Sequence, residues 1–503
     1  MSDVSGLLDS IKLDKKSKIP MYIQLYNILK EMILQGTLLP DFQLPSVRQF
    51  RDLLQINQVT VVSALKLLEN EGYVYKKQGS GTFVSRSIPA AYNNASADVN
   101  PISDELYQQD DVFLISNGQI KVGPDTVNFA SATPTPDLFP VEDFRKVLDE
   151  VLERDRGNAF GYQDSQGFYP IRESILGILR KSNITATPES IQIISGAQQG
   201  IDIISKALLA QGDYVVTESP TYTGALAVFK SRGAHIVDIE MLEDGPDLDI
   251  FEYNIKKYRP KLVYSIPSFQ NPTGYSYSNN KRREIIDLSV KYDFYILEDD
   301  YVSDLDFEGR NYLPLKAIDT HDRVIFIKSF SKIFMPGLRL GFMIVPYKLT
   351  NIILQAKHTT DISTSGLIQR AFDLYIRKGY WDKHFKFMFN IYKERYFKIN
   401  QALDSYLPAS VKFSRPGGGL NIWLSLPYGF PIETLIRQAA SEDIVFAPGR
   451  IFYSSPHVQK LDNIRLSFAS VYIEQIEDGI KKLCDMISRL QSSKIENRRV
   501  PLL

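Results

Sequence analysis

Among the residues of this chain that could do chemistry, Lys332 stands out because most of its neighbours in the sequence are apolar. Lys332 lies in the segment IKSFSKIFMPGLRLGF (327–342), directly after Ser331 and three residues after Ser329, and Arg339 follows seven residues later. Burial lowers the pKa of an amine because water no longer stabilises its charged form. A neutral amine attacks carbonyl compounds and forms Schiff bases with them. A lone lysine more often extends its charged end to the surface. The hypothesis that Lys332 forms a Schiff base therefore depends on which other residues accompany it.

Groups that suit a phosphorylated aromatic aldehyde occur at the ends of the expected strands. Pyridoxal 5'-phosphate needs a lysine for its aldehyde, a carboxylate for its ring nitrogen, donors for its phosphate and an aromatic face. SGAQQGIDIISKAL (195–208) predicts a small-residue turn that opens a helix, where the backbone N–H groups of Ala197 and Gln198 can hold a phosphate. The other candidates are Ser329 and Arg339, Tyr222 in ESPTYTG (218–224), Asn271 in FQNPTG (269–274), and Asp299 and Tyr301 in LEDDYVSD (297–304).

The segments SFSK…GLRLGF, NPTG and EDDY together make residues 128–480 resemble the fold-type I aminotransferases. The resemblance implies that Lys332 forms the internal aldimine, that Asp299 pairs with the pyridinium nitrogen and that Tyr222 stacks on the ring. It assigns the phenolic oxygen to Tyr301 and Asn271, and the phosphate to Ala197, Gln198, Ser329 and Arg339. It also implies that Tyr162, in FGYQDSQG, reaches the phosphate from the other subunit of a dimer. Arg465, in NIRLSFAS, matches the arginine that binds the α-carboxylate of a substrate.

The elements that must position these residues follow an α/β pattern. Residues 128–503 alternate helical patterns with short β-rich runs, and this predicts βα units around a mostly parallel sheet. The runs are YVVTES (214–219), LVYSIP (262–267), FYILEDD (294–300) and VIFIKSF (324–330). Ligands bind beyond the carboxyl ends of such strands. The resemblance adds a smaller C-terminal α+β subdomain.

The N-terminal residues have a different pattern, which predicts a winged helix-turn-helix. Helical periodicity covers 21–36, 44–54 and 58–73, and YVYKKQGSGTFVS (73–85) predicts two strands around a Gly-Ser-Gly turn. Residues 1–86 carry 11 Lys+Arg and 8 Asp+Glu, a net charge of +3. A small helical domain without nucleic acid fits the same pattern, and the weak positive charge does not decide between the two.

Several residues of this module are candidates for DNA contacts. In a winged helix-turn-helix the helix from residue 58 lies in the major groove. The candidates are Arg48 and Arg51 for phosphates, Asn57, Gln58, Thr60 and Ser63 near the start of that helix, and Gly79 for the tight turn of the wing.

The motifs LPS-x-R, TV-x-x-A-x-x-L-x-x-x-EG and G-x-GTFV make residues 20–85 resemble the GntR family of bacterial regulators, which implies that the module binds double-stranded DNA. The family often has Ser-Arg or Thr-Arg where this chain has Asn57-Gln58. These amides can pair with adenine.

The chain has 503 residues, more than one core holds, so at least two domains are expected. We predict a DNA-binding domain at 11–86, a linker at 87–127 and a cofactor-binding domain at 128–495. The sequence has no apolar run of 18 residues and no signal-peptide pattern. One cysteine and five histidines argue against a disulfide framework and a zinc site. A cytoplasmic protein without metal or membrane association is expected.

The two halves together resemble the MocR subfamily of GntR regulators. The resemblance implies that the larger domain senses an amino acid or amine through an external aldimine. It also implies a domain-swapped homodimer whose conformational change repositions the two DNA-binding domains. An active aminotransferase carrying a DNA-binding domain is the alternative, and a third hypothesis is a DNA-binding protein that keeps the cofactor for structure. Relatives that respond to GABA carry an arginine where this chain has Gly224. An α-amino acid held by Arg465 is therefore the preferred effector.

Overall fold

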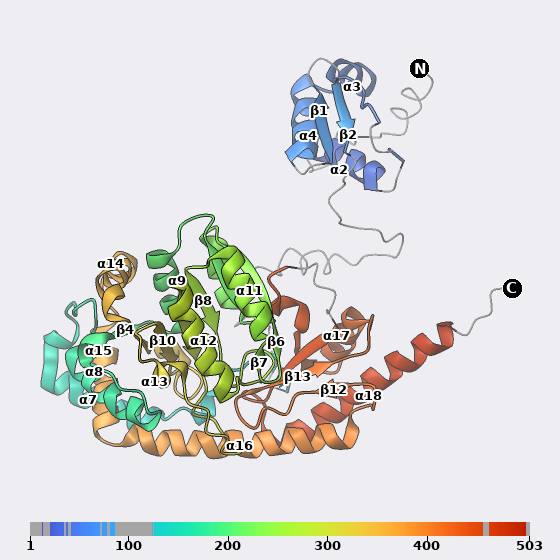
Figure 1. Ribbon diagram of the computed structural model, residues 1–503. Helices are drawn as coiled ribbons and strands as arrows, with labels where there is room; N and C mark the ends of the chain where they lie inside the picture. Colours follow the sequence, from blue (N-terminus) through green and yellow to red (C-terminus); the bar gives the residue numbers. More distant parts are fainter. Residues whose placement is uncertain are drawn as a thin grey trace. The chain divides into compact units, whose positions relative to one another are not determined.

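The computed structural model describes residues 13, 21–34, 37–38, 42–70, 73–77, 81–85, 123, 125–455 and 462–498. Two compact units are present, within Met1–Ser103 and Asp104–Leu503, and both are drawn in Figure 1. Most of the expected linker 87–127 lies outside the described residues, so the expected domain boundaries stay a prediction. Within the described ranges no helix is long and apolar enough to cross a membrane, and no group of three His, Cys, Asp or Glu residues could hold a metal ion.

The smaller unit is the winged helix-turn-helix that the sequence predicts. Its helices are α2 (Met21–Leu34), α3 (Val47–Leu54) and α4 (Gln58–Asn70), and its antiparallel strands are β1 (Val74–Lys77) and β2 (Gly81–Val84). Ser46 starts α3 with a capping box: its hydroxyl accepts from the Gln49 N–H, and the Gln49 side chain accepts from the Ser46 N–H. One core joins the elements through buried side chains that include Leu25, Leu29, Phe50, Val61, Leu65 and Leu68.

The larger unit is built on an eight-stranded sheet in the order β4-β11-β10-β9-β8-β5-β6-β7. Strand β11 is antiparallel to both neighbours and β7 is antiparallel to β6, while the five strands between them are parallel. The strands are β4 (Ile191–Ile194), β5 (Tyr214–Ser219), β6 (His235–Leu242), β7 (Gly245–Pro246), β8 (Leu262–Ser265), β9 (Tyr295–Asp300), β10 (Val324–Ser329) and β11 (Gly341–Ile344). The four expected runs are β5, β8, β9 and β10, so the predicted fold class is confirmed.

Helices cover both faces of this sheet because both faces are apolar. Neighbouring side chains of a strand point to opposite faces: Val215 of β5 packs in the core with α9 and α10, and Val216 packs in the core with α11 and α12. The helices are α7 (Val141–Asp155), α8 (Tyr169–Lys181), α9 (Ala197–Leu208), α10 (Thr223–Ser231), α11 (Leu248–Tyr258), α12 (Asn279–Tyr292), α13 (Leu315–Ile318), α14 (Thr350–Asp361) and α15 (Gly366–Arg377). Short 3-10 turns occur at Pro136–Leu138, Arg156–Ala159, Pro188–Ser190, Pro336–Leu338, Tyr347–Leu349 and Gly449–Phe452.

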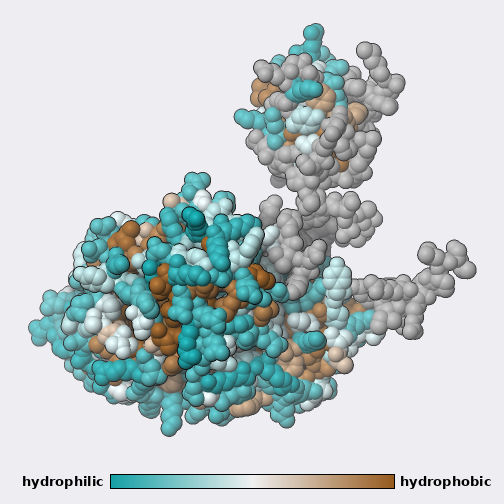
Figure 2. Space-filling model, in the orientation of Figure 1, coloured by the Kyte–Doolittle hydropathy of each residue, from teal (hydrophilic) through white to brown (hydrophobic). Residues whose placement is uncertain are grey.

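The long helix α16 (Tyr380–Tyr406) leads from this sheet to a smaller α+β part, as Figure 1 shows. A second sheet there has the order β12-β13-β16-β15 and is antiparallel. Its strands are β12 (Lys412–Phe413), β13 (Asn421–Ser425), β15 (Ala447–Pro448) and β16 (Asn463–Ser467), and its helices are α17 (Ile432–Ser441) and α18 (Ile473–Arg498). Strand β14 (Ile444–Val445) pairs with β3 (Val127–Asn128), which ties the start of the unit to its end. The visible surface of the larger unit is mainly hydrophilic (Figure 2).

Phe50 offers a test of whether the two units fold independently. Its side chain is fully buried, so Phe50→Ala should cost about 3–5 kcal/mol, close to the whole stability of a domain of this size, roughly 5 kcal/mol. We expect this variant to lose helical circular dichroism from α2–α4. Both tryptophans of the chain, Trp381 and Trp423, lie in the larger unit, so the unfolding transition followed by their fluorescence should keep its midpoint. Phe50→Leu is the control, and an equal shift of the tryptophan transition would contradict independent folding.

Candidate functional site

A single pocket beyond the strand ends of the larger unit contains nine of the expected site residues. Its lining is Ala132, Ala197, Gln198, Tyr222, Ile266, Asn271, Asp299, Tyr301, Ser329, Ser331, Lys332 and Arg339. These residues meet because the parallel strands end at the same edge of the sheet. Arg465 is buried and bonds to Asn271 of this lining. Tyr162 is not part of it, and its side chain is 85% exposed.

Lys332 lies in the turn after β10, and α16 holds that turn in place. The carbonyl oxygen of Lys332 accepts a hydrogen bond from the Tyr392 hydroxyl at 2.8 Å, and the next carbonyl, of Ile333, lies 2.8 Å from Nε2 of His384. Burial lowers the pKa of Lys332 to about 8; the positive charge of Arg465 acts in the same direction, and Asp299 opposes it. A larger share of the Lys332 amine than of an ordinary lysine is therefore neutral, and able to attack a carbonyl, near neutral pH.

Asp299 is a buried carboxylate with one oxygen left for a ligand. Its Oδ2 accepts a hydrogen bond from the Tyr264 hydroxyl at 2.7 Å, whereas its Oδ1 is buried and has no partner. Burial raises the pKa of Asp299 to about 6, and the nearby Asp300 and Glu218 add to the effect. An unpaired buried oxygen is costly, and a protonated ring nitrogen is a donor of the kind that would satisfy it.

Tyr222 and Gln198 form one wall of the pocket. The Tyr222 hydroxyl donates to Gln198 Oε1 at 3.1 Å, and Gln198 Nε2 donates to the Gly224 carbonyl at 2.9 Å. A Cβ atom on Gly224 would lie 2.3 Å from Gln198 Oε1 and 2.6 Å from the Tyr222 ring. The tyrosine therefore keeps this position only because residue 224 has no side chain.

A second group of polar residues, in and next to the pocket lining, bond to one another. The Tyr301 hydroxyl donates to the Phe269 carbonyl at 2.6 Å and accepts from Asn421 Nδ2 at 3.1 Å. Arg465 donates from Nη1 to Asn271 Oδ1 at 3.1 Å and from Nη2 to the Ala130 carbonyl, and its Nε has no partner. Burial lowers the pKa of Arg465 to about 10. A buried guanidinium with a spare donor suits an incoming carboxylate.

The Arg339 side chain lies against the residues just before α9, and we call this group of residues the cradle. Gly196 precedes the helix with φ +89°, and a Cβ there would lie 2.7 Å from Arg339 Nη2, so only glycine fits. The same Nη2 donates to the Ser195 carbonyl at 2.8 Å, and Ser329 Oγ lies 3.1 Å from Ser331 Oγ. The first N–H groups of a helix lack partners inside the helix and attract phosphate.

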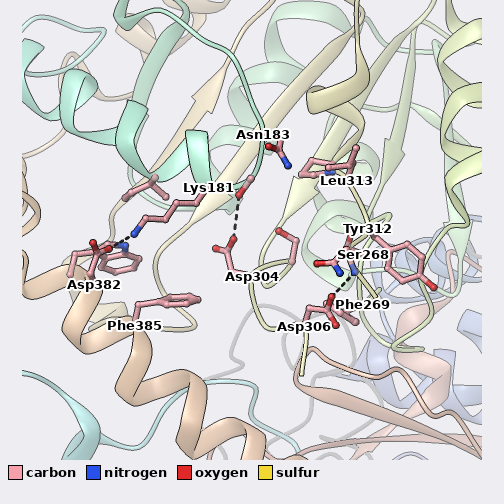
Figure 3. A pocket seen from close by; sticks show the side chains of 16 residues that line it. Lys181, Asn183, Ser268, Phe269, Asp304, Asp306, Tyr312, Leu313, Asp382 and Phe385 are labelled. Carbon is pink, nitrogen blue, oxygen red and sulfur yellow. Dashed lines mark hydrogen bonds and ion pairs between the residues drawn. The ribbon is translucent and has the colours of Figure 1, made fainter. Parts of the chain in front are cut away.

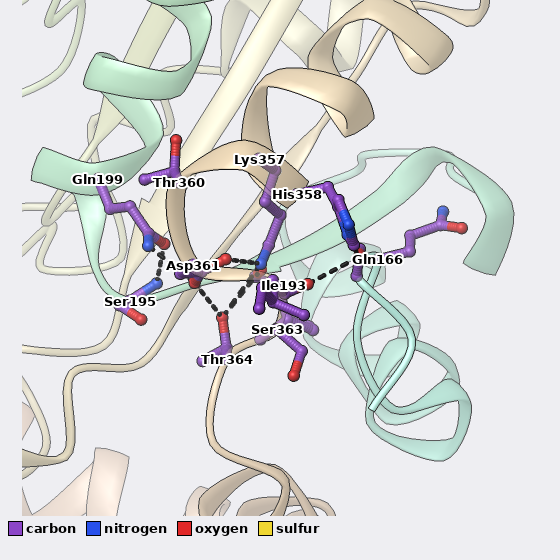
Figure 4. Close-up of polar contacts among 12 residues, drawn as sticks. Gln166, Ile193, Ser195, Gln199, Lys357, His358, Thr360, Asp361, Ser363 and Thr364 are labelled. Atoms are coloured by element: carbon purple, nitrogen blue, oxygen red, sulfur yellow. Dashed lines mark hydrogen bonds and ion pairs between the residues drawn. The ribbon is translucent and has the colours of Figure 1, made fainter. Parts of the chain in front are cut away.

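A partly buried polar chain, which the sequence analysis missed, bonds to Ser195 just before α9 (Figure 4). Gln199 Oε1 accepts from the Ser195 N–H at 2.7 Å, and Gln199 Nε2 donates to Asp361 Oδ2 at 2.8 Å. Lys357, whose side chain is fully buried, pairs with Asp361 Oδ1 at 2.9 Å. Gln199 and Asp361 are 162 residues apart in sequence, so no local pattern indicates their contact.

A second cleft, shown in Figure 3, has charged groups that are already paired. Lys181 and Asp382 form an ion pair at 2.5 Å, and Asp304 bonds to Lys328 at 2.8 Å and to Ser182 Oγ at 3.4 Å. Asp306 accepts from the N–H groups of Gly309 and Asn311. The charged side chains that line this cleft therefore all have partners among the described residues.

In the smaller unit, four of the expected DNA-contact residues lie at or near the start of α4, and Arg48 and Arg51 lie on α3. Gln58 is exposed and Thr60 and Ser63 are partly exposed. Asn57 Oδ1 accepts from the Val59 N–H at 3.1 Å and so caps the helix. Arg51 pairs with Asp52 at 2.6 Å, and Arg48, with an 84% exposed side chain, is 3.8 Å from the same carboxylate. Gly79 lies outside the described residues.

Comparisons with known proteins agree with both halves of the chain. Residues 124–483 match the family described as aminotransferase class I and II, and residues 21–84 match the bacterial regulatory proteins of the gntR family. The aromatic-amino-acid aminotransferase 1 of Thermococcus litoralis is 32% identical over 72% of this chain and 88% of its own. The probable rhizopine catabolism regulatory protein MocR of Rhizobium meliloti is 28% identical over 96% of each chain.

A solved structure also matches the larger unit. LysN, an α-aminoadipate aminotransferase from Thermus thermophilus in complex with N-(5'-phosphopyridoxyl)-L-leucine, has a TM-score of 0.70 at 28% identity, over 78% of this chain and 98% of its own. The two family matches together assign the chain to a family. The protein belongs to the aminotransferase class I and II family through its larger unit and, with the GntR-type module that precedes it, to the MocR subfamily of GntR transcriptional regulators.

Proposed function

We propose that this transcriptional regulator holds pyridoxal 5'-phosphate in its larger unit and responds to an α-amino acid that displaces Lys332 from it. One observation carries the proposal: the reactive amine of Lys332 and the partnerless Oδ1 of Asp299 line the same pocket. When bound, the cofactor supplies an aldehyde that condenses with amines, and a ring that withdraws electrons. The residues of the chain bind and orient it.

The roles proposed for these residues follow from their positions. Asp299 accepts the proton-bearing ring nitrogen with its spare oxygen, and Tyr222 provides the stacking face. The phosphate lies in the cradle of Ala197, Gln198, Ser329 and Arg339, where two N–H groups, a hydroxyl and a guanidinium converge. Tyr301 and Asn271 face the phenolic oxygen. Lys332 supplies the amine that holds the aldehyde until an effector takes its place.

Arg465 is the proposed partner of the effector carboxylate. Its Nη1 bonds to Asn271 at 3.1 Å, and its Nε is the spare donor that a carboxylate can use. The shared guanidinium links effector binding to Asn271, a residue proposed to touch the cofactor. An amine without a carboxylate lacks that link, which favours an α-amino acid as the effector.

The proposed assembly is a domain-swapped homodimer. Tyr162 is 85% exposed within its own chain, and its proposed target is the phosphate in the partner subunit. Two DNA-binding modules per dimer contact two half-sites, and a conformational change in the larger units alters the spacing between the half-sites that the modules can reach.

Lys332→Ala should abolish covalent attachment of the cofactor. Borohydride reduction of the wild-type protein with pyridoxal 5'-phosphate, followed by peptide mass spectrometry, should place the cofactor on the Lys332 peptide, and the variant should carry none. Lys206→Ala, which changes an exposed lysine of α9, is the control and should be labelled like the wild type. Labelling at Lys328 in place of Lys332 would contradict the assignment.

Arg465→Leu should separate sensing from cofactor binding. We expect the variant to attach the cofactor at Lys332, and to lose the change in DNA affinity that an effective α-amino acid causes in the wild type. The standard α-amino acids can be screened by cofactor absorbance, and Kd can be measured on a duplex that the wild type selects from a random pool. If amino acids change the absorbance of the wild type and leave its Kd unchanged, the sensor proposal fails. Release of keto acid over many turnovers would support an enzyme instead.

Asp299→Asn should make the cofactor-free protein more stable, and more so at higher pH. The folded pKa of Asp299 is about 6, above its ordinary value of 3.8. The folded protein therefore binds this proton more tightly, and its stability falls as pH rises from about 4 to about 6. Asparagine removes this loss, on the order of 2–3 kcal/mol. Urea unfolding at pH 5 and pH 7.5 measures the difference, which must be larger at pH 7.5; a difference that shrinks with pH would refute the assignment. The same variant should bind pyridoxal 5'-phosphate more weakly.

A further inference from the structure

Two exposed valines form an apolar stripe on the outer face of α4. The inner face of this helix is buried through Val61, Ala64, Leu65 and Leu68. On the outer face the side chain of Val59 is 69% exposed and that of Val62 is 45% exposed. Valine is a poorer helix former than Ala, Lys, Gln or Glu, and the exposed part of each side chain gains nothing from the core. The stripe thus needs a reason outside the folding of this unit.

We propose that Val59 and Val62 contact the C5-methyl groups of thymines in the major groove, and so make the regulator prefer A·T pairs at two neighbouring positions of its half-site. The inference rests on DNA binding by the GntR-type module. In the major groove an A·T pair displays the C5-methyl group of thymine, which apolar side chains recognise, and a G·C pair displays no methyl group. A methyl recognised by a valine needs no hydrogen bond.

The spacing of the two valines fits this partner. Side chains three residues apart on a helix are about 5–6 Å apart, and successive bases of a strand rise by about 3.4 Å. Val59 and Val62 can therefore meet methyl groups on neighbouring base pairs. Both lie in the first half of α4 (Gln58–Asn70), the part of a recognition helix that contacts base edges.

The neighbours of the stripe are those of a DNA-binding surface rather than of a protein interface. Gln58, next to Val59, is exposed, and a glutamine amide pairs with the adenine of an A·T pair. Lys66, one turn beyond Val62, is also exposed and suits a phosphate. Polar and cationic groups around two small apolar side chains match the mixed edge pattern of the groove.

Uracil substitution tests the contact at the level of single methyl groups. A half-site is first selected from a random duplex pool by the full-length wild-type protein. Each thymine is then replaced by deoxyuridine, which removes only the C5-methyl, and Kd is measured for each duplex. We expect two neighbouring positions at which the wild type loses about three- to fivefold in affinity, the effect of one buried methyl group. Val59→Ala should lose a similar factor on the thymine duplex and become insensitive to uracil at one of these positions, and Val62→Ala at the other.

The matched control is Val141→Ala, which truncates a 56% exposed valine of α7 in the larger unit; it should bind both duplexes like the wild type. Circular dichroism should be unchanged in all three variants because each changes an exposed side chain. The proposal is overturned if the wild type binds thymine and uracil duplexes equally, or if Val59→Ala loses the same factor on both. A protein partner on the stripe would give the first of these results. If the wild type selects no sequence at all, both sequence-specific DNA binding by this module and the proposed thymine contacts are wrong.

Discussion

The removal of one amine and one carboxylate from water is the constraint on which the larger unit depends. Lys332 and Asp299 line the same pocket, and burial moves the pKa of both toward the neutral form, to about 8 and about 6. Neither group is stable there without support. The backbone of the lysine is held by Tyr392, and the carboxylate by the Tyr264 hydroxyl. Much of the surrounding architecture serves to keep these two groups in place.

Other buried charged side chains near the strand ends are stabilised by several hydrogen bonds each. Glu218, at the end of β5, is buried and accepts from Ser265 Oγ, the Ile266 N–H, Gln270 Nε2 and the Tyr277 hydroxyl. Arg282, fully buried on α12, donates to the carbonyls of Tyr277, Leu313 and Pro267. These bonds fix the loop that carries Asn271, so the position of a pocket residue depends on charges that never reach the pocket.

Local patterns in the sequence predicted the parts of this arrangement that depend on neighbouring residues. Short β-rich runs between helical patterns predicted β5, β8, β9 and β10, and the winged helix-turn-helix followed from helical periodicity and a glycine turn. Contacts between distant segments could not be predicted in this way. The Gln199–Asp361–Lys357 chain, the Tyr264–Asp299 bond and the Asn421–Tyr301 bond each join residues that only the folded sheet brings together. Nor does sequence show that Asn57, a candidate for base contacts, uses its side-chain oxygen to cap α4.

Two lysines of the same short segment illustrate what the fold adds to the sequence. Lys328 and Lys332 are four residues apart in IKSFSK, and burial alone would lower the pKa of both. Lys328 lies 2.9 Å from Asp300 and 2.8 Å from Asp304, and these carboxylates outweigh burial and raise its pKa. Lys332 has no such pair among the described residues; two arginines and burial outweigh the pull of Asp299. Lys328 therefore stays charged as part of the framework, whereas Lys332 can become neutral. Which lysine can become neutral is decided by carboxylates of β9 and the turn after it, and not by the apolar residues beside it in the sequence.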